Sequence, residues 1–217
     1  MLSLLAADPG SKRAVITILR ARELEDPANP DVSCTLGLQF LIRHGRLHTV
    51  AYLRANDAVT GLLCDVFSFT LIAEYAAGLL GVGLGTYGHH VGSMHINDYD
   101  AAKAAAIIGA RRAPTFPVQA MPPTWPADLG IVADLEQALR LNQTQIAPGQ
   151  ADSLGLPPYW QQVVLLFEAY RQIVHLPGSA ITPQVLDALE PGYRWLFCHR
   201  WPERVSVTAR TEPRETR

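Results

Sequence analysis

The chain has 217 residues, of which 48% are hydrophobic, enough to form a sizeable core. Its formal charge of −2 at pH 7 excludes the global basic field of a nucleic-acid-binding protein. The odd number of cysteines and the absence of a C-x-x-C spacing exclude a disulfide framework and a structural zinc site; Cys34, Cys64 and Cys198 are expected to be free thiols in a reducing compartment.

The first half of the chain predicts strands. Residues 12–21 are rich in β-branched side chains and predict a strand. Residues 36–43 and 47–54 alternate apolar and polar side chains and are joined by His44 and Gly45. Because glycine adopts positive φ without strain, this arrangement predicts a tight β-hairpin.

A long apolar segment follows the hairpin. Residues 66–80 are apolar nearly all round and predict a buried helix that ends before Gly81. Residues 84–96 predict a further strand, and residues 98–110 a helix. Because Glu74 and several glycines interrupt the apolar segment, and no signal-peptide pattern precedes it, we expect no membrane partner and a cytoplasmic location.

The second half of the chain is helical in pattern. Five prolines between residues 113 and 129 predict an extended connector. Helical patterns return at 130–142, 158–176 and 183–189. Strands followed by helices predict the α+β class. We expect one domain over residues 1–204, followed by a polar tail over residues 205–217.

Residues 34–97 carry the most specific pattern. They contain a cysteine, a glutamine five residues later, an Arg-x-x-Asp, a glycine, a polar residue before the apolar helix, and a histidine after it. In order these are Cys34, Gln39, Arg54, Asp57, Gly61, Asp65 and His95. This spacing resembles the thymidylate synthases without a gap. The match covers roughly residues 5–100 and includes a basic pair, Lys12 and Arg13.

The resemblance implies a mixed sheet covered by helices with a helical C-terminal part. It also implies a homodimer that transfers one carbon from 5,10-methylenetetrahydrofolate to C5 of a pyrimidine nucleoside monophosphate. In that family pattern Cys34 attacks C6 of the base, a step suited to a soft thiolate that cations such as Arg54 stabilise.

The resemblance also assigns the substrate contacts. Arg54 forks onto the phosphate, with Lys12 and Arg13 reaching in from a partner chain. Asp57 addresses the pyrimidine edge and His95 holds the sugar 3′-hydroxyl. Gln39 supports the nucleotide from the first hairpin strand.

Each residue alone also has a structural interpretation. A single cysteine is usually a small buried side chain, and a histidine in an apolar strand is usually a core residue. His89 and His90 are adjacent in the sequence, but neighbouring strand residues face opposite sides, so we expect no metal site. The pattern as a whole, with seven residues in register, indicates the family.

Asp65 departs from the family, which carries an amide at this position to read uracil. A carboxyl group accepts a hydrogen bond from N4 of cytosine and, when protonated, donates one to N3. Asp65 therefore favours a cytosine nucleotide, as in the related cytidylate and deoxycytidylate hydroxymethylases. The alternative interpretation is that Asp65 caps the helix predicted over residues 66–80.

Two smaller departures concern the sugar and phosphate. Ala55 replaces a phosphate-contacting serine, and Asn97 replaces the sugar-binding tyrosine. Both changes shorten the pocket lining and allow room for a ribose 2′-hydroxyl, so CMP joins dCMP as an expected substrate.

The match is short at both ends. Only 33 residues precede Cys34, so the family's catalytic glutamate and its folate-side tryptophan have no counterpart. Without that shielding, water rather than hydride completes the reaction, which favours hydroxymethylation. Thymidylate synthesis from dUMP and a truncated, inactive nucleotide-binding paralogue remain the alternatives. Glu168 and Asp187 are conceivable replacements for the glutamate.

Overall fold

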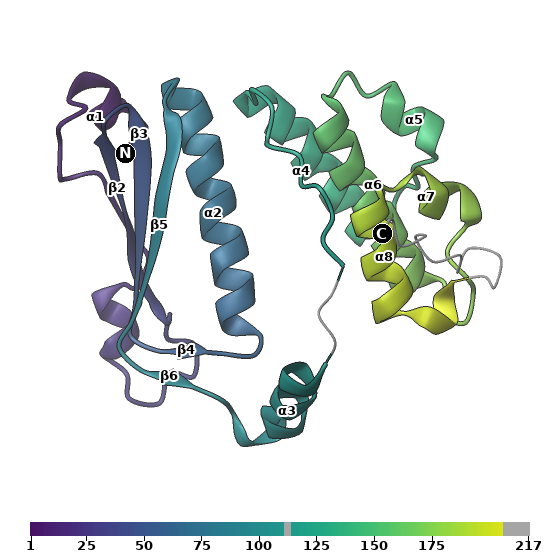
Figure 1. Ribbon diagram of the computed structural model, residues 1–217, viewed down its shortest axis with the longest axis horizontal. Coiled ribbons are helices and arrows are strands. Elements are labelled where there is room, and N and C mark those ends of the chain that lie inside the picture. The colour runs from purple at the N-terminus through teal and green to yellow at the C-terminus, as the bar shows by residue number, and fades with distance from the viewer. Residues whose placement is uncertain (111–113, 206–217) are drawn as a thin grey trace. The chain divides into compact units, whose positions relative to one another are not determined.

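The computed structural model describes residues 1–110 and 114–205 (Figure 1). The chain packs as two compact units, Met1–Arg112 and Ala113–Arg217. The sequence predicts one domain over residues 1–204, whereas each unit has its own hydrophobic cluster, because the proline-containing connector interrupts the apolar pattern. Most of the predicted tail lies outside the described residues.

The first unit is built on a mixed four-stranded sheet with the order β1-β2-β3-β5. Its strands are β1 (Val15–Thr17), β2 (Thr35–Arg43), β3 (Arg46–Leu53) and β5 (Gly83–Val91). All neighbours are antiparallel except β3 and β5, which are parallel. A second, parallel pair joins β4 (Asn56–Asp57) to β6 (Met94–His95). The predicted α+β class is confirmed.

The predicted hairpin is confirmed. Arg43 pairs with Arg46 across a two-residue turn in which His44 has φ 50° and Gly45 has φ 70°. Both turn residues are left-handed, as a tight hairpin with the natural strand twist requires. The strand predicted over residues 12–21 is shorter, since β1 covers only Val15–Thr17; the amides of Ile18 and Leu19 still donate to the Leu36 and Thr35 carbonyls, and a 3₁₀ helix begins at Ala21.

Helix α2 (Gly61–Leu80) packs on one face of the sheet together with α1 (Leu2–Ala7). The predicted helix over 66–80 begins five residues earlier than expected and ends, as predicted, at a left-handed Gly81. Its C-terminal half turns a stripe of small side chains to the sheet, so that the backbones approach closely. The buried residues are Phe69, Ala73, Ala76 and Ala77.

The prediction that α2 is buried all round is wrong, since Leu63 and Phe67 are largely exposed. By length and composition alone α2 could cross a membrane, a property that core helices of water-soluble domains share. Beyond β5 the chain forms a short 3₁₀ turn and α3 (Ala101–Gly109), close to the helix predicted over 98–110.

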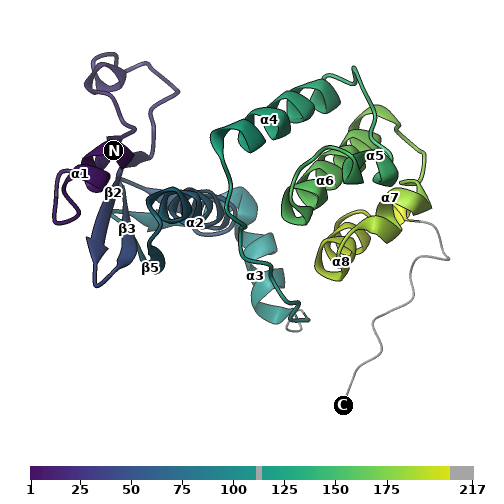
Figure 2. The same cartoon turned by 90° about the horizontal axis from the view of Figure 1, so that it is seen from above.

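The second unit is helical. Its helices are α4 (Pro126–Arg140), α5 (Pro148–Asp152), α6 (Pro158–His175), α7 (Pro183–Ala188) and α8 (Pro191–Arg200). Helix α6 lies between α4 on one side and α7 and α8 on the other (Figure 2). The sequence predicts α4, α6 and α7 but not α8 or α5, of which α5 has only five residues.

A buried ion pair fixes the middle of α6. The carboxylate of Glu168 accepts hydrogen bonds from Arg171 Nε at 2.8 Å and Nη2 at 2.7 Å. It also accepts from Gln172 Nε2 at 2.8 Å and from the Ile146 amide at 3.2 Å. The side chains of Glu168 and Arg171 are only 2% and 6% exposed, so neither charge can turn to water.

We expect Glu168→Ala to lower the free energy of unfolding of the second unit by about 3–5 kcal/mol, because Arg171 is left buried and unpaired. Glu136→Ala is the matched control, since Glu136 forms an exposed pair with Arg140, and it should cost less than about 1 kcal/mol. Urea unfolding followed by tryptophan fluorescence measures both, because all four tryptophans lie in this unit. Equal losses from the two variants would contradict this account.

Candidate functional site

One end of the sheet gathers most of the predicted site residues. Cys34 precedes β2, and its carbonyl accepts the amide of Arg54, which follows β3, at 2.9 Å. Asp57 and His95 lie opposite each other in the β4–β6 pair at the same end (Figure 1). The first turn of α2 follows β4 directly. The structure therefore brings Cys34, Arg54, Asp57 and His95 to one edge of the first unit.

Arg54 holds the backbone that leads into Cys34. Its Nε donates to the Ser33 carbonyl at 3.0 Å and its Nη2 to the Val32 carbonyl at 2.9 Å. The Cys34 side chain is exposed, so a ligand can reach the thiol. Arg54 thus positions the nucleophile loop, and its exposed guanidinium keeps Nη1, which bonds to no described residue, for a phosphate.

The carboxylate of Asp57 begins helix α2. It accepts the amides of Val59 at 3.1 Å, Thr60 at 2.8 Å and Gly61 at 3.0 Å. These hydrogen bonds, led by the one from Gly61, lower the pKa of Asp57. Because this side chain is engaged with the helix start, the predicted contact with the pyrimidine edge falls to its backbone groups and stays a prediction.

Asp65 lies inside α2, so the interpretation of Asp65 as the helix cap is wrong. Its Oδ2 accepts a hydrogen bond from Asn56 Nδ2 at 3.0 Å. Asn56 Nδ2 also lies 3.0 Å from His89 Nε2, and His89 Nδ1 lies 2.6 Å from the Tyr87 hydroxyl. Burial, and then the charge of Asp65, raise the pKa of Tyr87 to about 12. We call these four residues the Asp65 network.

Sequence reasoning missed the Asp65 network. No role was predicted for Asn56, which is only 4% exposed in the structure. His89 was considered only as a metal ligand. The usable signal was alternation: Tyr87 and His89 pair with Thr49 and Ala51 of β3, which are buried. The rings of Tyr87 and His89 therefore lie on the buried face of the sheet, where their polar atoms need hydrogen-bond partners. Polar side chains gathered there indicate a polar site.

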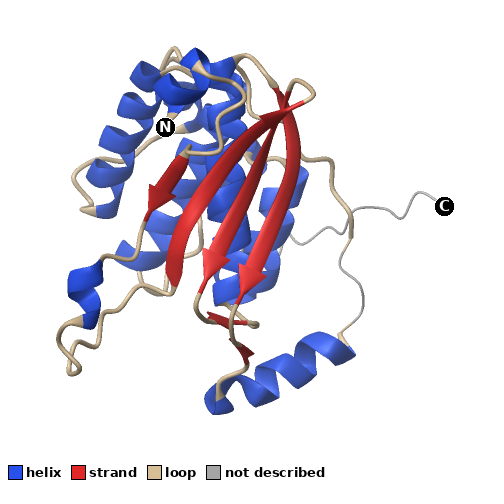
Figure 3. Ribbon diagram, turned by 90° about the vertical axis from the view of Figure 1, so that its left-hand side faces the viewer, coloured by secondary structure: helices blue, strands red, loops and turns tan. Residues whose placement is uncertain are grey.

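The expectation that His89 and His90 face opposite sides is confirmed, since His90 stacks on Tyr52, with ring centroids 5.5 Å apart, away from the Asp65 network. The Tyr52 hydroxyl donates to Gln39 Oε1 at 3.3 Å, and Gln39 Nε2 donates to the Lys12 carbonyl at 3.0 Å. In the described part of the first unit no helix covers this face of the sheet (Figure 3).

Lys12 and Arg13 are not brought to Cys34 within one chain. They precede β1, which runs antiparallel to β2 with Val15 opposite Gln39. That register places the basic pair toward the hairpin turn, at the far end of β2 from Cys34. Their predicted contact with phosphate therefore requires a partner chain.

His95 and Asn97 follow the edge of the site. The His95 carbonyl accepts the Ala58 amide at 2.9 Å, and the Asn97 carbonyl accepts the Asp100 amide at 2.9 Å. Backbone contacts thus fix both residues while the His95 side chain stays exposed. The sugar contacts predicted for them stay predictions.

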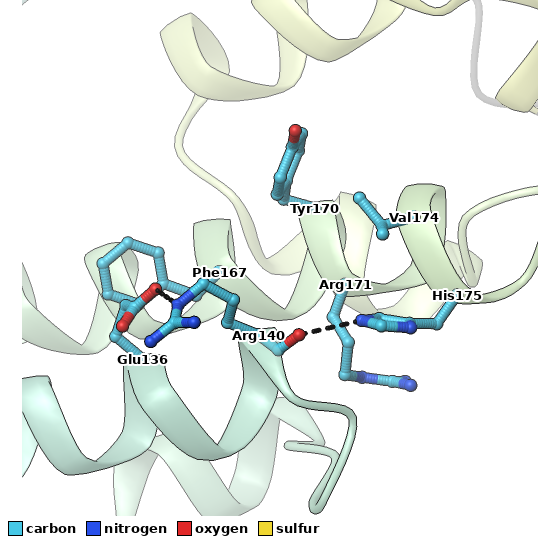
Figure 4. Close-up of a pocket in the computed structure, with 7 residues that line it drawn as sticks. All are labelled: Glu136, Arg140, Phe167, Tyr170, Arg171, Val174 and His175. Carbon is cyan, nitrogen blue, oxygen red and sulfur yellow. Dashed lines mark hydrogen bonds and ion pairs between the residues drawn. The ribbon is translucent and has the colours of Figure 1, made fainter. Parts of the chain in front are cut away.

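The second unit holds fewer candidate functional residues than the first. Glu168 is saturated by its buried partners, and Asp187 forms an exposed pair with Arg194 at 3.7 Å. A pocket of about 240 Å³ lies along α4 and α6 (Figure 4). Its polar side chains are engaged: Arg140 with Glu136, and His175 with the Arg140 carbonyl at 3.0 Å. Among the described residues no group of histidine, cysteine and acidic side chains could hold a metal ion.

Comparison with known proteins places the family match of this chain mainly in its first unit. Residues 1–124 match the family model described as thymidylate synthase. The chain is 36% identical over 99 residues to a protein of Methanocaldococcus jannaschii named "Putative thymidylate synthase", covering 43% of this chain and 45% of that protein. It is 32% identical over 88 residues to a thymidylate synthase of Symbiobacterium thermophilum, covering 41% and 30%. The chain thus spans less than half of either relative.

We expect one tyrosine of the folded protein to ionise near pH 12, because burial and the charge of Asp65 oppose the Tyr87 phenolate. A pKa raised above the unfolded value of 10.0 stabilises the fold fully below pH 10, and this contribution is lost as pH rises toward 12. Absorbance at 295 nm should lose this late step in Tyr87→Phe.

Tyr193→Phe is the control for this titration. Burial also raises the pKa of Tyr193, but in the second unit. The late step near pH 12 should therefore survive Tyr193→Phe. If Tyr87→Phe leaves that step intact, the Tyr87 hydroxyl does not lie in the electrostatic environment described here.

Proposed function

The chain belongs to the thymidylate synthase family, and from this premise we propose that it transfers a one-carbon unit to C5 of a pyrimidine nucleoside monophosphate. The observation that carries the proposal is the exposed Cys34 thiol at the sheet edge, beside the arginine that holds its loop. We propose cytidylate, CMP or dCMP, as the substrate and a hydroxymethyl group as the product.

The chemistry starts at the thiol. The Cys34 thiolate bonds to C6 of the base, and the electrons of the C5–C6 double bond move to C5, which becomes nucleophilic. C5 would then bond to the one-carbon unit and lose its proton to water, the folate nitrogen would leave with its electron pair, water would add to the resulting methylene carbon, and the thiolate would leave as the C5–C6 double bond returns. Arg54 holds the loop that carries Cys34 in place through its hydrogen bonds to the Ser33 and Val32 carbonyls.

The family uses methylenetetrahydrofolate, which supplies a one-carbon unit at the oxidation level of formaldehyde. The first unit contains no tryptophan to pack against its pterin ring, since all four tryptophans lie in residues 113–217. The folate half of the site is therefore not assigned to residues. That lack of shielding in the family-matched unit favours water over hydride in the last step, and hence hydroxymethylation.

Asp65 supports cytosine as the base. With Oδ2 bonded to Asn56, the carboxylate offers acceptor lone pairs to the N4 amino group of cytosine. Uracil carries the O4 acceptor in place of the N4 amino group, so the oxygen atom that would receive a proton from cytosine N4 would face a lone pair instead. An unmatched polar edge costs about 1–3 kcal/mol, which is enough for useful discrimination.

Thymidylate synthesis from dUMP is the second candidate, favoured by the similarity to the Symbiobacterium protein. A third is a nucleotide-binding paralogue without turnover, since the chain matches only part of its relatives. The three free thiols of the structure support a reducing, cytoplasmic compartment for any of these roles.

We also propose a homodimer formed through the uncovered face of the sheet. This face carries the Tyr52–His90 stack and the partly exposed Val50 at its centre. A second copy packed there would cover an apolar surface and could bring Lys12 and Arg13 to the phosphate of the facing site.

The proposed reaction requires C5 to lose its proton, so tritium at C5 should appear in water. We expect release from tritiated CMP or dCMP with methylenetetrahydrofolate, more slowly from dUMP, and none in Cys34→Ala. Cys64→Ala removes another exposed thiol and should keep the activity. Release from dUMP alone would favour thymidylate synthesis. No release from any nucleotide would favour the binder.

The dimer proposal has its own test. We expect Val50→Glu to shift the protein to monomers in sedimentation velocity, because it buries a charge at the centre of the proposed interface. Ile108→Glu places the same charge on α3 and should leave the dimer intact. A monomeric wild-type protein at micromolar concentration would refute the dimer.

A further inference from the structure

We propose that Asn56, His89 and Tyr87 act as positioning residues that keep Asp65 in the acceptor form selective for cytosine. This inference rests on the proposed function, because it concerns the base-reading half of that site. It assigns roles to three residues outside the pattern that relates this chain to its family, and it goes beyond the choice of Asp65 itself.

The hydrogen bonds of Asn56 fix which atoms donate and which accept along the Asp65 network. Nδ2 carries two protons; one reaches Asp65 Oδ2 at 3.0 Å and the other reaches His89 Nε2 at 3.0 Å. Nε2 must then be an unprotonated acceptor, so a neutral His89 carries its proton on Nδ1. Nδ1 donates to the Tyr87 hydroxyl oxygen at 2.6 Å.

The fold holds the amide in this orientation. A Cβ atom at Gly61 would lie 2.5 Å from Asn56 Oδ1, so the absence of a side chain at residue 61 leaves room for that oxygen. The Asn56 amide N–H donates to the Ser93 carbonyl at 3.0 Å, which fixes the backbone. Asn56 is therefore held between α2 and Ser93, which directly precedes β6.

The opposite arrangement is self-consistent but places a proton on Asp65. If the amide rotated, Oδ1 would accept from a protonated Asp65 and from His89 Nε2, and Tyr87 would donate to Nδ1. The tautomer of His89 is thus coupled to the proton on Asp65. In the arrangement of the structure Asp65 Oδ2 accepts from Asn56, and the carboxyl group presents acceptor lone pairs, which suit the cytosine amino group and oppose uracil O4.

The adjacent histidines provide a matched test. In His89→Phe the ring cannot accept from Asn56, so the ratio of the Kd values for UMP and CMP, measured by calorimetry, should fall about ten-fold. His89→Gln keeps an acceptor oxygen and should retain most of the preference. His90→Phe, on the opposite face of β5, should leave the ratio unchanged. Circular dichroism verifies folding of each variant.

A spectroscopic readout separates this role from a merely structural one. ¹⁵N NMR of the histidine rings should show His89 as the neutral tautomer protonated at Nδ1, with Tyr87→Phe weakening that preference. An Nε2-protonated ring in the wild type would overturn the inference. So would an unchanged Kd ratio in His89→Phe, or wild-type protein that does not distinguish CMP from UMP.

The proposed function and this inference can fail separately. Absence of tritium release refutes turnover, yet a cytosine preference that depends on His89 would still support the network. Tritium release with a preference insensitive to His89→Phe would refute the network and leave the reaction in place.

Discussion

The parallel pairing of β3 with β5 is the constraint on which the candidate site depends. Two parallel neighbouring strands require a crossover connection. Helix α2, which lies between β3 and β5 in the sequence, supplies it by running back across one face of the sheet. The carboxyl ends of β3 and β5, the start of β2 and the first turns of α2 therefore meet at one edge. Open sheets commonly bind ligands at the carboxyl ends of their strands.

Two acidic side chains, one on each side of the start of α2 at Gly61, illustrate how this edge divides its work. Asp57 gives its carboxylate to three amides and starts α2. Asp65, one turn into the helix, is thereby released from capping and turns to Asn56. Helix initiation and the base recognition that we propose for Asp65 are thus assigned to different carboxylates, and the Asp65 network satisfies the buried side-chain amide of Asn56.

The short-range features of the fold could be predicted from the sequence. Alternation and the His44-Gly45 pair gave the hairpin, and Gly81 gave the end of α2. The contacts between Asn56 and His89 could not, because residues 33 positions apart meet only after the parallel crossover has formed. Nor could the separation of the second unit, because the prolines of the connector predicted an extended segment and not a boundary between two cores.

The same division applies to the site. The resemblance to the thymidylate synthases pointed to Cys34, Arg54, Asp57 and His95, and the structure brings all four to one edge. It could not show that the Asp57 carboxylate is already engaged, or that Lys12 and Arg13 lie at the far end of β2. Those facts depend on strand register and on which hydrogen bonds the folded backbone leaves open.

The central claim is that Cys34 adds to a cytosine ring, and trapping the adduct tests it most directly. Fluorine at C5 cannot leave as the proton does, so 5-fluoro-CMP with methylenetetrahydrofolate should remain bonded to the protein. Intact-mass spectrometry is predicted to show one nucleotide–folate adduct per chain, mapped to the peptide containing Cys34 and absent from Cys34→Ala. An unmodified mass, or an adduct on Cys64, would contradict the account.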